Sequence, residues 1–96
     1  MKIVILRSAV EDLDRGYKFY EQKTAGLGDY FMHSLFSDIE SLLIFAGIHR
    51  KVHGYHRLLS KRFPYAIYYR IEEESIRIRA VLDCRRSPDW ISRKVD

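Results

Sequence analysis

The sequence contains one cysteine, two prolines and no long apolar run. A single cysteine, Cys84, cannot form an intrachain disulfide, which is typical of proteins in a reducing compartment, so we expect a cytoplasmic location. No apolar stretch approaches the roughly 20 residues that cross a bilayer. The short apolar stretch near the N-terminus is followed at once by charged residues rather than by a signal-peptide pattern. We therefore predict no membrane partner.

The sequence also lacks the patterns of common nucleotide and hydrolase sites, since it has no Walker loop, G-x-G-x-x-G or G-x-S-x-G. His49, His53 and His56 follow an H-x3-H-x2-H spacing, but no carboxylate or thiol accompanies them. Because structural zinc sites usually hold four ligands, we predict a surface histidine cluster without a metal. Cys84 has no paired histidine and is predicted to be a small core or edge residue. We expect no cofactor.

The composition is that of one small globular domain. The chain has 96 residues, of which 47% are hydrophobic, so we assign residues 1–96 to a single domain. The net charge of +4 is distributed unevenly. Residues 1–48 hold five basic and seven acidic residues, a net of −2, whereas residues 49–96 hold twelve basic and six acidic residues, a net of +6. The second half therefore predicts either a surface for nucleic acid or an acidic partner, or a solvated sheet face.

The first half of the sequence is typical of a strand followed by two helices. Residues 2–7 are β-branched and apolar and predict a strand. Ser8 and Glu11 have the spacing of a capping box, which predicts a helix over residues 9–23. Gly26 and Gly28 break this helix, Asp29 is the expected N-cap of a second helix, and Gly47 is its expected end. The apolar positions at helical spacing are Val10, Leu13, Tyr17 and Tyr20 in the first helix, and Phe31, Leu35, Ile39, Leu42, Leu43 and Ala46 in the second.

The second half has the period of a sheet. Strands are predicted over residues 55–62, 65–72 and 75–83. In the second of these, Tyr69 is expected to point inward and Tyr68 outward, where it is a candidate for stacking on a base. The third alternates between Ile76, Ile78, Ala80 and Leu82 on the core side and Arg77, Arg79, Val81 and Asp83 on the outside. Pro88 suits the first turn of a short terminal helix over residues 88–94. The predicted fold class is α+β: an N-terminal strand and a two-helix hairpin packed on one face of a small antiparallel sheet, with a short C-terminal helix.

The order of motifs in the second half resembles the toxins of the RelE/ParE superfamily, which belong to bacterial type II toxin–antitoxin modules. Members commonly show a basic strand, an F-P-Y motif before an aromatic strand, and then an arginine pair, a proline and a tryptophan. The matching residues here are Arg57, Lys61, Arg62, Phe63, Pro64, Tyr65, Arg85, Arg86, Pro88 and Trp90. The first half is similar at Ala9, Asp12, Leu13, Tyr20, the 26–28 turn and Phe31.

This resemblance implies two unrelated mechanisms. RelE-like toxins cut mRNA in the ribosomal A site, whereas ParE-like toxins poison DNA gyrase without cutting RNA. RelE places two lysines where this chain has His56 and Leu58, and an arginine where it has Ala66; the late tyrosine of RelE falls near Trp90 or Ile91. The arginine after the last strand is kept as Arg85. YoeB-like toxins use a C-terminal histidine, but no histidine follows His56.

We therefore expect a type II toxin that is neutralised by a cognate antitoxin, within a toxin–antitoxin hetero-oligomer, and that inhibits DNA gyrase by binding. Growth inhibition and plasmid stabilisation are the roles that the resemblance implies. The alternatives are a ribosome-dependent mRNA endoribonuclease and a non-toxic relic that only binds its antitoxin. Arg85 and His56 are the catalytic candidates, and the candidates for binding a target or nucleic acid are Arg57, Arg70, Arg77, Arg79, Arg85, Arg86 and Trp90. The alternative role of the arginines is to form a solvated or antitoxin-binding face of the sheet. The alternative role of Trp90 is to pack in the core.

Overall fold

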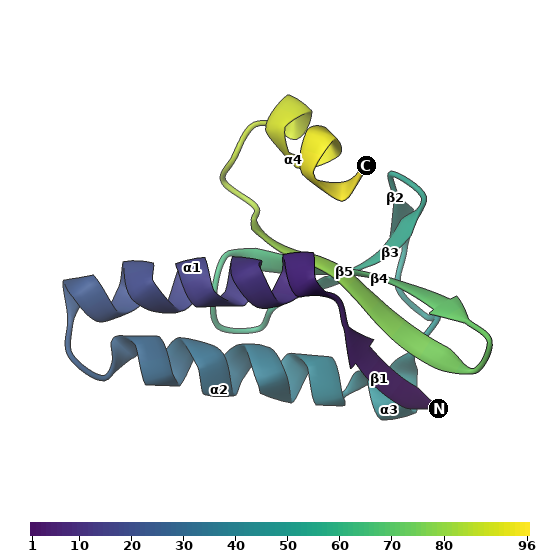
Figure 1. Cartoon of the computed structure of the whole chain (residues 1–96), viewed down its shortest axis with the longest axis horizontal. Coiled ribbons are helices and arrows are strands. Elements are labelled where there is room, and N and C mark those ends of the chain that lie inside the picture. The colour runs from purple at the N-terminus through teal and green to yellow at the C-terminus, as the bar shows by residue number, and fades with distance from the viewer.

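The computed structural model describes residues 1–96 as a helical layer packed on a sheet, with a short helix on the other side (Figure 1). The elements in chain order are β1 (Lys2–Ile5), α1 (Arg7–Lys23), α2 (Leu27–Glu40), α3 (Leu42–Phe45), β2 (Lys51–Val52), β3 (Tyr55–Leu59), β4 (Tyr65–Glu72), β5 (Ser75–Asp83) and α4 (Pro88–Val95). None of the helices is long and apolar enough to cross a membrane. The predicted α+β class is confirmed, and the bounds of β4 and β5 are those expected from the sequence.

The sheet has the strand order β1-β5-β4-β3-β2 and is mixed rather than purely antiparallel. β1 runs parallel to β5, with Lys2 opposite Ser75 and Ile5 opposite Ile78, and all other neighbours are antiparallel. The short strand β2 was not predicted, and β3 ends three residues earlier than expected, before the turn that contains Pro64.

The helical hairpin differs from the prediction at both N-termini. Leu6 is the N-cap of α1, and the Ser8 hydroxyl donates to the carbonyl oxygen of Arg79 instead of capping the helix. Gly26, with φ of 89°, is the N-cap of α2, and Asp29 lies in the first turn. The two expected caps are therefore wrong. The α1 stripe is also rotated, because Val10 is exposed and the buried positions are Ala9, Asp12, Leu13, Gly16 and Tyr20.

The second helix does not continue to residue 46 as predicted. It stops at Glu40, where the Ser41 hydroxyl donates to the carbonyl oxygen of Asp38, a local bond that competes with the helical backbone pattern. A single turn, α3, follows, and Gly47 with φ of 96° ends it in the expected left-handed conformation. Leu42 is buried, but Leu43 faces solvent, which contradicts its predicted place on one continuous apolar face.

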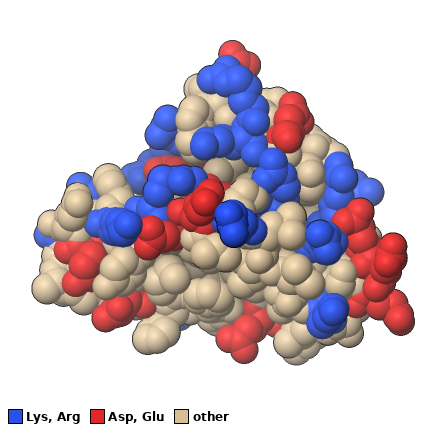
Figure 2. All heavy atoms as spheres, viewed as in Figure 1, with Lys and Arg blue, Asp and Glu red and all other residues tan.

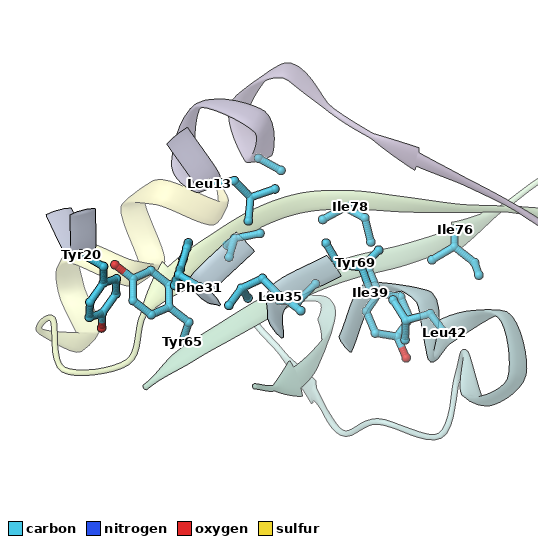
Figure 3. Packing of buried hydrophobic residues seen from close by; sticks show 13 residues of the cluster. Leu13, Tyr20, Phe31, Leu35, Ile39, Leu42, Tyr65, Tyr69, Ile76 and Ile78 are labelled. Carbon is cyan, nitrogen blue, oxygen red and sulfur yellow. The ribbon is translucent and has the colours of Figure 1, made fainter. Parts of the chain in front are cut away.

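The main core lies between the helical hairpin and the sheet. Leu13 and Tyr20 of α1, and Phe31, Leu35 and Ile39 of α2, pack on Tyr65, Ile67 and Tyr69 of β4 and on Ile76, Ile78 and Val81 of β5 (Figure 3). Phe31 lies at the aromatic end of this core, where its ring contacts those of Tyr20, Phe63 and Tyr65. Burial of these side chains drives the docking of the hairpin, at about 25 cal/mol per Å² of apolar surface.

A second, smaller cluster fills the opposite face of the sheet. The register between β4 and β5 shifts at Tyr68/Tyr69, so Arg79 is an extra residue in β5. Beyond this bulge Val81 faces the helical hairpin, whereas Ala80 and Leu82 face α4, so the strict alternation predicted for β5 is wrong past residue 79. Tyr68 is only 1% exposed because it packs beneath α4 with Val95, which contradicts its predicted role as an outward stacking residue.

Candidate binding groove and its basic rim

A groove of about 450 Å³ separates α1 from α4, with β5 as its floor. α4 is connected to β5 by residues 84–87, and it stands clear of α1 (Figure 1). The groove is lined by both apolar or aromatic side chains and charged ones. The lining residues are Asp12, Arg15, Gly16, Phe19, Tyr65, Val81, Leu82, Asp83, Arg86, Trp90 and Lys94.

Asp12 fixes one wall of the groove to its floor. Its carboxylate accepts a hydrogen bond of 3.0 Å from the backbone N–H of Val81, just past the bulge, and it is also paired with Arg15 one turn along α1. Burial raises the pKa of Asp12, and the bonds from Val81 and Arg15 act in the opposite direction. Asp12 thus joins residues that are 69 positions apart and serves the groove mainly as a structural tie.

Arg85, the residue kept from the ribonuclease pattern, is held by a neighbouring carboxylate. Its Nε and Nη2 atoms donate to the two carboxylate oxygens of Asp83 at 2.9 and 2.8 Å, and its backbone N–H donates to the same group. These bonds lower the pKa of Asp83 and raise that of Arg85. The guanidinium is therefore largely neutralised within the chain.

Arg86 and Lys94 are the cations of the rim that take part in no ion pair. The guanidinium of Arg86 lies 4.0 Å from the centre of the Trp90 ring, and the ammonium of Lys94 lies 5.5 Å from it. Neither side chain takes part in any of the ion pairs of the chain, which join Arg15 to Asp12, Lys18 to Asp14, Arg77 to Glu72 and Arg85 to Asp83. Figure 2 shows a gathering of basic side chains over α4 and the adjoining part of the sheet.

Trp90 lies where it can both stabilise the core and contact a partner. It packs against the smaller core cluster and also lines the groove. The Ser87 hydroxyl accepts from the Trp90 backbone N–H as the N-cap of α4, and Pro88 occupies the first turn as predicted. α4 thus starts at a fixed point, which sets the direction in which Trp90 and Lys94 project.

The other predicted arginines are spread around the α4 side of the sheet. Arg70 stacks on Tyr55 at 4.0 Å and donates to the carbonyl oxygen of Gly54, and Arg77 is paired with Glu72. Arg79 has a structural role, because it donates to the Ser8 hydroxyl and to the backbone oxygen of Asp96, joining α1, β5 and the end of α4. Arg57 pairs across the strands with Tyr68 and lies close enough to lower its pKa, although burial raises it overall. The structure thus does not gather these four residues into the groove.

His56 lies on the opposite face from this basic rim. Its Nδ1 is 2.7 Å from the backbone oxygen of His49, its ring stacks on Tyr69, and His49 Nδ1 bonds the Tyr69 hydroxyl. Burial and the neighbouring His56 lower the pKa of His49. His53 lies in the turn before β3, and no group of three His, Cys, Asp or Glu side chains is arranged to hold a metal. His56 and Arg85 therefore do not form a common catalytic group.

Cys84 is exposed at the end of β5, which excludes the predicted core position and leaves the edge. Partial burial of its sulfur raises the thiol pKa, with Arg57 acting in the opposite direction, and a raised pKa disfavours the nucleophilic thiolate form.

The groove is suited to binding rather than to bond cleavage. It offers an apolar and aromatic floor with two free cations at its rim, which matches an amphipathic segment that carries acidic groups. The sequence indicated Arg86 and Trp90, but it did not indicate Phe19, Tyr65 or Lys94 as neighbours. Asp12 carried a signal in retrospect, because it is a carboxylate within the buried stripe of α1.

Comparisons with known proteins agree with this fold. No curated protein sequence is detectably similar to the chain. The solved structure described as "Chromosomal ParDE TA system from P. aeruginosa" superposes with a TM-score of 0.71 at 23% sequence identity, covering 84% of this chain and 92% of the other, a similarity of fold alone. The model of the ParE toxin of the type II toxin–antitoxin system parDE matches residues 3–88. The chain therefore belongs to the ParE toxin family of the RelE/ParE superfamily.

Proposed function

We propose that this toxin inhibits DNA gyrase by binding to it, and that the segment from Arg85 to Arg93 makes the contact. The observation that carries the proposal is the rim of the groove, where Arg86 is stacked on Trp90 and unpaired. The residues that contribute most of the binding energy in protein interfaces are enriched in arginine and tryptophan. Two positions that carry cations in the ribonuclease pattern are apolar and face the interior here, since Ala66 is fully buried and Leu58 packs against the main core. This favours inhibition by binding over cleavage of RNA.

The mechanism that follows needs no acid or base from the chain. An inhibitor of this kind acts by occupying a surface of its target, with the cations steering the approach and the aromatic ring fixing the docked state. Arg85 contributes less than Arg86 to this steering, because Asp83 compensates its charge.

Expression of the chain alone in bacterial cells tests the proposal. We expect growth arrest with induction of the SOS response and accumulation of linear DNA, while transcripts stay intact. The purified chain should inhibit supercoiling by gyrase directly. Cleaved transcripts without an SOS response would instead establish the ribonuclease alternative, and a folded chain with neither effect would establish the non-toxic relic.

We further propose that a cognate antitoxin neutralises the toxin by placing an amphipathic, acidic segment in the groove between α1 and α4. Such a segment matches the free charges of Arg86 and Lys94 and the aromatic floor. Affinity for the antitoxin should fall as salt rises, and Arg86→Glu should weaken it. Lys61→Glu is the matched control, because Lys61 is exposed but does not line the groove. Equal affinities for both variants, with no dependence on salt, would exclude this electrostatic contribution.

A further inference from the structure

An exposed apolar surface lies at the other side of the molecule from α4. It comprises Leu43, Ile44, Phe45 and Ile48, which are 57%, 79%, 49% and 72% exposed, together with the neighbouring Ile71. A side-chain Cβ at Gly47 would lie 3.4 Å from the Cδ1 of Ile71, so the loop after α3 contacts the end of β4. We name these five residues the α3 patch; Figure 1 shows α3 at the end of the helical layer, away from α4.

The exposure of the α3 patch follows from the break at Ser41. Only Leu42 of this turn is anchored in the core, at 1% exposure, so the next three side chains are directed outward. The other exposed large apolar residues on α1 and α2, such as Val10, Phe19 and Tyr30, are separated along their helices, which is ordinary for a protein surface. Consecutive exposed apolar residues are not ordinary, and in soluble proteins they mark interaction sites.

The two chain segments that follow the α3 patch carry charges of opposite sign. The turn after Ile71 carries Glu73 and Glu74, and the segment after Ile48 carries Arg50 and Lys51. All four are exposed, and none of them takes part in an ion pair within the chain. Figure 2 shows acidic side chains gathered at the right-hand tip of the molecule, where β4 turns into β5, next to mostly uncharged surface.

We propose that the α3 patch is the interface between two copies of this chain. A two-fold axis through the patch would place the acidic side of each copy against the basic side of the other, so one surface complements itself in both apolar and charged groups. An acidic peptide or nucleic acid on the same surface would meet Glu73 and Glu74 without compensation. The patch is small, so the dimer is a weak and reversible one. The groove between α1 and α4 stays open in it, and the proposal is independent of the choice of target.

Sedimentation velocity of the full-length chain over a wide range of concentrations tests the dimer. The wild type should shift from monomer to dimer as concentration rises, and Ile44→Glu should stay monomeric. Val10→Glu is the matched control, because Val10 is an apolar side chain of α1 with 51% exposure and should leave the equilibrium unchanged. Thermal unfolding of each variant verifies that the fold is intact.

Charge reversal gives a second, independent readout. Glu74→Lys and Arg50→Glu should each raise the dissociation constant about tenfold, which corresponds to about 1.4 kcal/mol. An equimolar mixture of the two variants should recover association, because the Glu74→Lys side chain of one copy then faces the Arg50→Glu side chain of the other. A wild type that is monomeric throughout, or single reversals that do not repair each other, would overturn the proposal. Loss of antitoxin capture by Ile44→Glu with a monomeric wild type would do the same and assign the patch to the antitoxin.

Discussion

Gly16 of α1 lies directly against the ring of Phe31 in α2. A Cβ at position 16 would come within 2.5 Å of the Phe31 Cζ and 2.7 Å of its Cε2, and real Cβ atoms do not approach so closely. The absence of a side chain at Gly16 lets the two helices pack at the aromatic end of the core, where Phe31 is fully buried. A similar close approach occurs at Gly28, whose Cβ would lie 2.8 Å from the backbone oxygen of Tyr17.

We therefore expect Gly16→Ala to destabilise the toxin, although alanine is the better helix former. Overpacking costs about 1–3 kcal/mol, and the gain in helix propensity offsets about 1 kcal/mol of it. Urea denaturation measures the net loss of free energy of unfolding. In a Phe31→Leu background the smaller side chain relieves the clash, so adding Gly16→Ala should be neutral or stabilising there. A loss of equal size in both backgrounds would show that the Phe31 ring is not the cause.

The pH dependence of stability should reveal the buried carboxylate of Asp12. Burial raises its pKa above the ordinary value of 3.8. At a pH between the pKa of Asp12 in the unfolded chain, 3.8, and its higher pKa in the folded chain, the folded chain binds more protons than the unfolded chain. The contribution of Asp12 to the free energy of unfolding therefore falls as pH rises above 3.8. Asp12→Asn keeps an acceptor for the Val81 N–H and removes the titration.

The difference between wild type and Asp12→Asn isolates this effect from Asp83, whose lowered pKa gives the opposite slope. We expect the free energy of unfolding of Asp12→Asn, relative to the wild type, to rise with pH through this window. A pH-independent difference would mean that Asp12 titrates alike in the folded and unfolded states.

Tyr69 is predicted to hold the segment after α3 in place. Its hydroxyl accepts from the Gly47 N–H at 3.0 Å and bonds His49 Nδ1, and the residue is completely buried. Tyr69→Phe keeps the ring but removes the hydroxyl, so the Gly47 N–H and His49 Nδ1 lose their hydrogen-bond partner. This should lower the free energy of unfolding by about 1–3 kcal/mol. A double-mutant cycle with His49→Ala should show non-additivity because the two side chains share one bond. Strictly additive losses would argue against the His49 bond.

Local patterns in the sequence predicted the bounds of individual strands and helices better than the contacts between them. The alternation in residues 65–72 and 75–83 gave the correct bounds of β4 and β5, since each pattern depends on residues that are close in the chain. The bulge at Arg79 had no such signal, because it depends on the register between two strands. The prediction that Tyr68 faces solvent was wrong because the same local alternation is compatible with a solvated sheet face and with a face covered by α4. The groove between α1 and α4 was not predicted for the same reason: Asp12 and Phe19 meet Asp83, Trp90 and Lys94 across most of the chain length.

The C-terminal segment should carry toxicity, with Arg86 contributing more than Arg85. Asp83 neutralises Arg85 through two side-chain bonds, whereas Arg86 is free of ion pairs. We expect Arg86→Ala to keep its fold and lose at least about tenfold in affinity for the target, or about 1.4 kcal/mol. Arg85→Ala should retain most of its toxicity, which makes it the matched control. Equal loss of toxicity in both variants would show that net charge alone matters.

Trp90 needs a different design, because it lies both in the smaller core cluster and in the groove wall. Trp90 is half-buried, and its removal costs a large part of the roughly 3–5 kcal/mol that a fully buried aromatic side chain contributes. Loss of toxicity in Trp90→Ala could therefore reflect loss of the fold. Trp90→Leu keeps an apolar side chain against the smaller core cluster while removing the ring on which Arg86 stacks. Thermal unfolding is measured first, and growth after induction is scored only for variants that unfold cooperatively. A folded Trp90→Leu that still arrests growth at the wild-type level would assign Trp90 to the core alone, whereas a folded variant that has lost toxicity would place the ring in contact with the target.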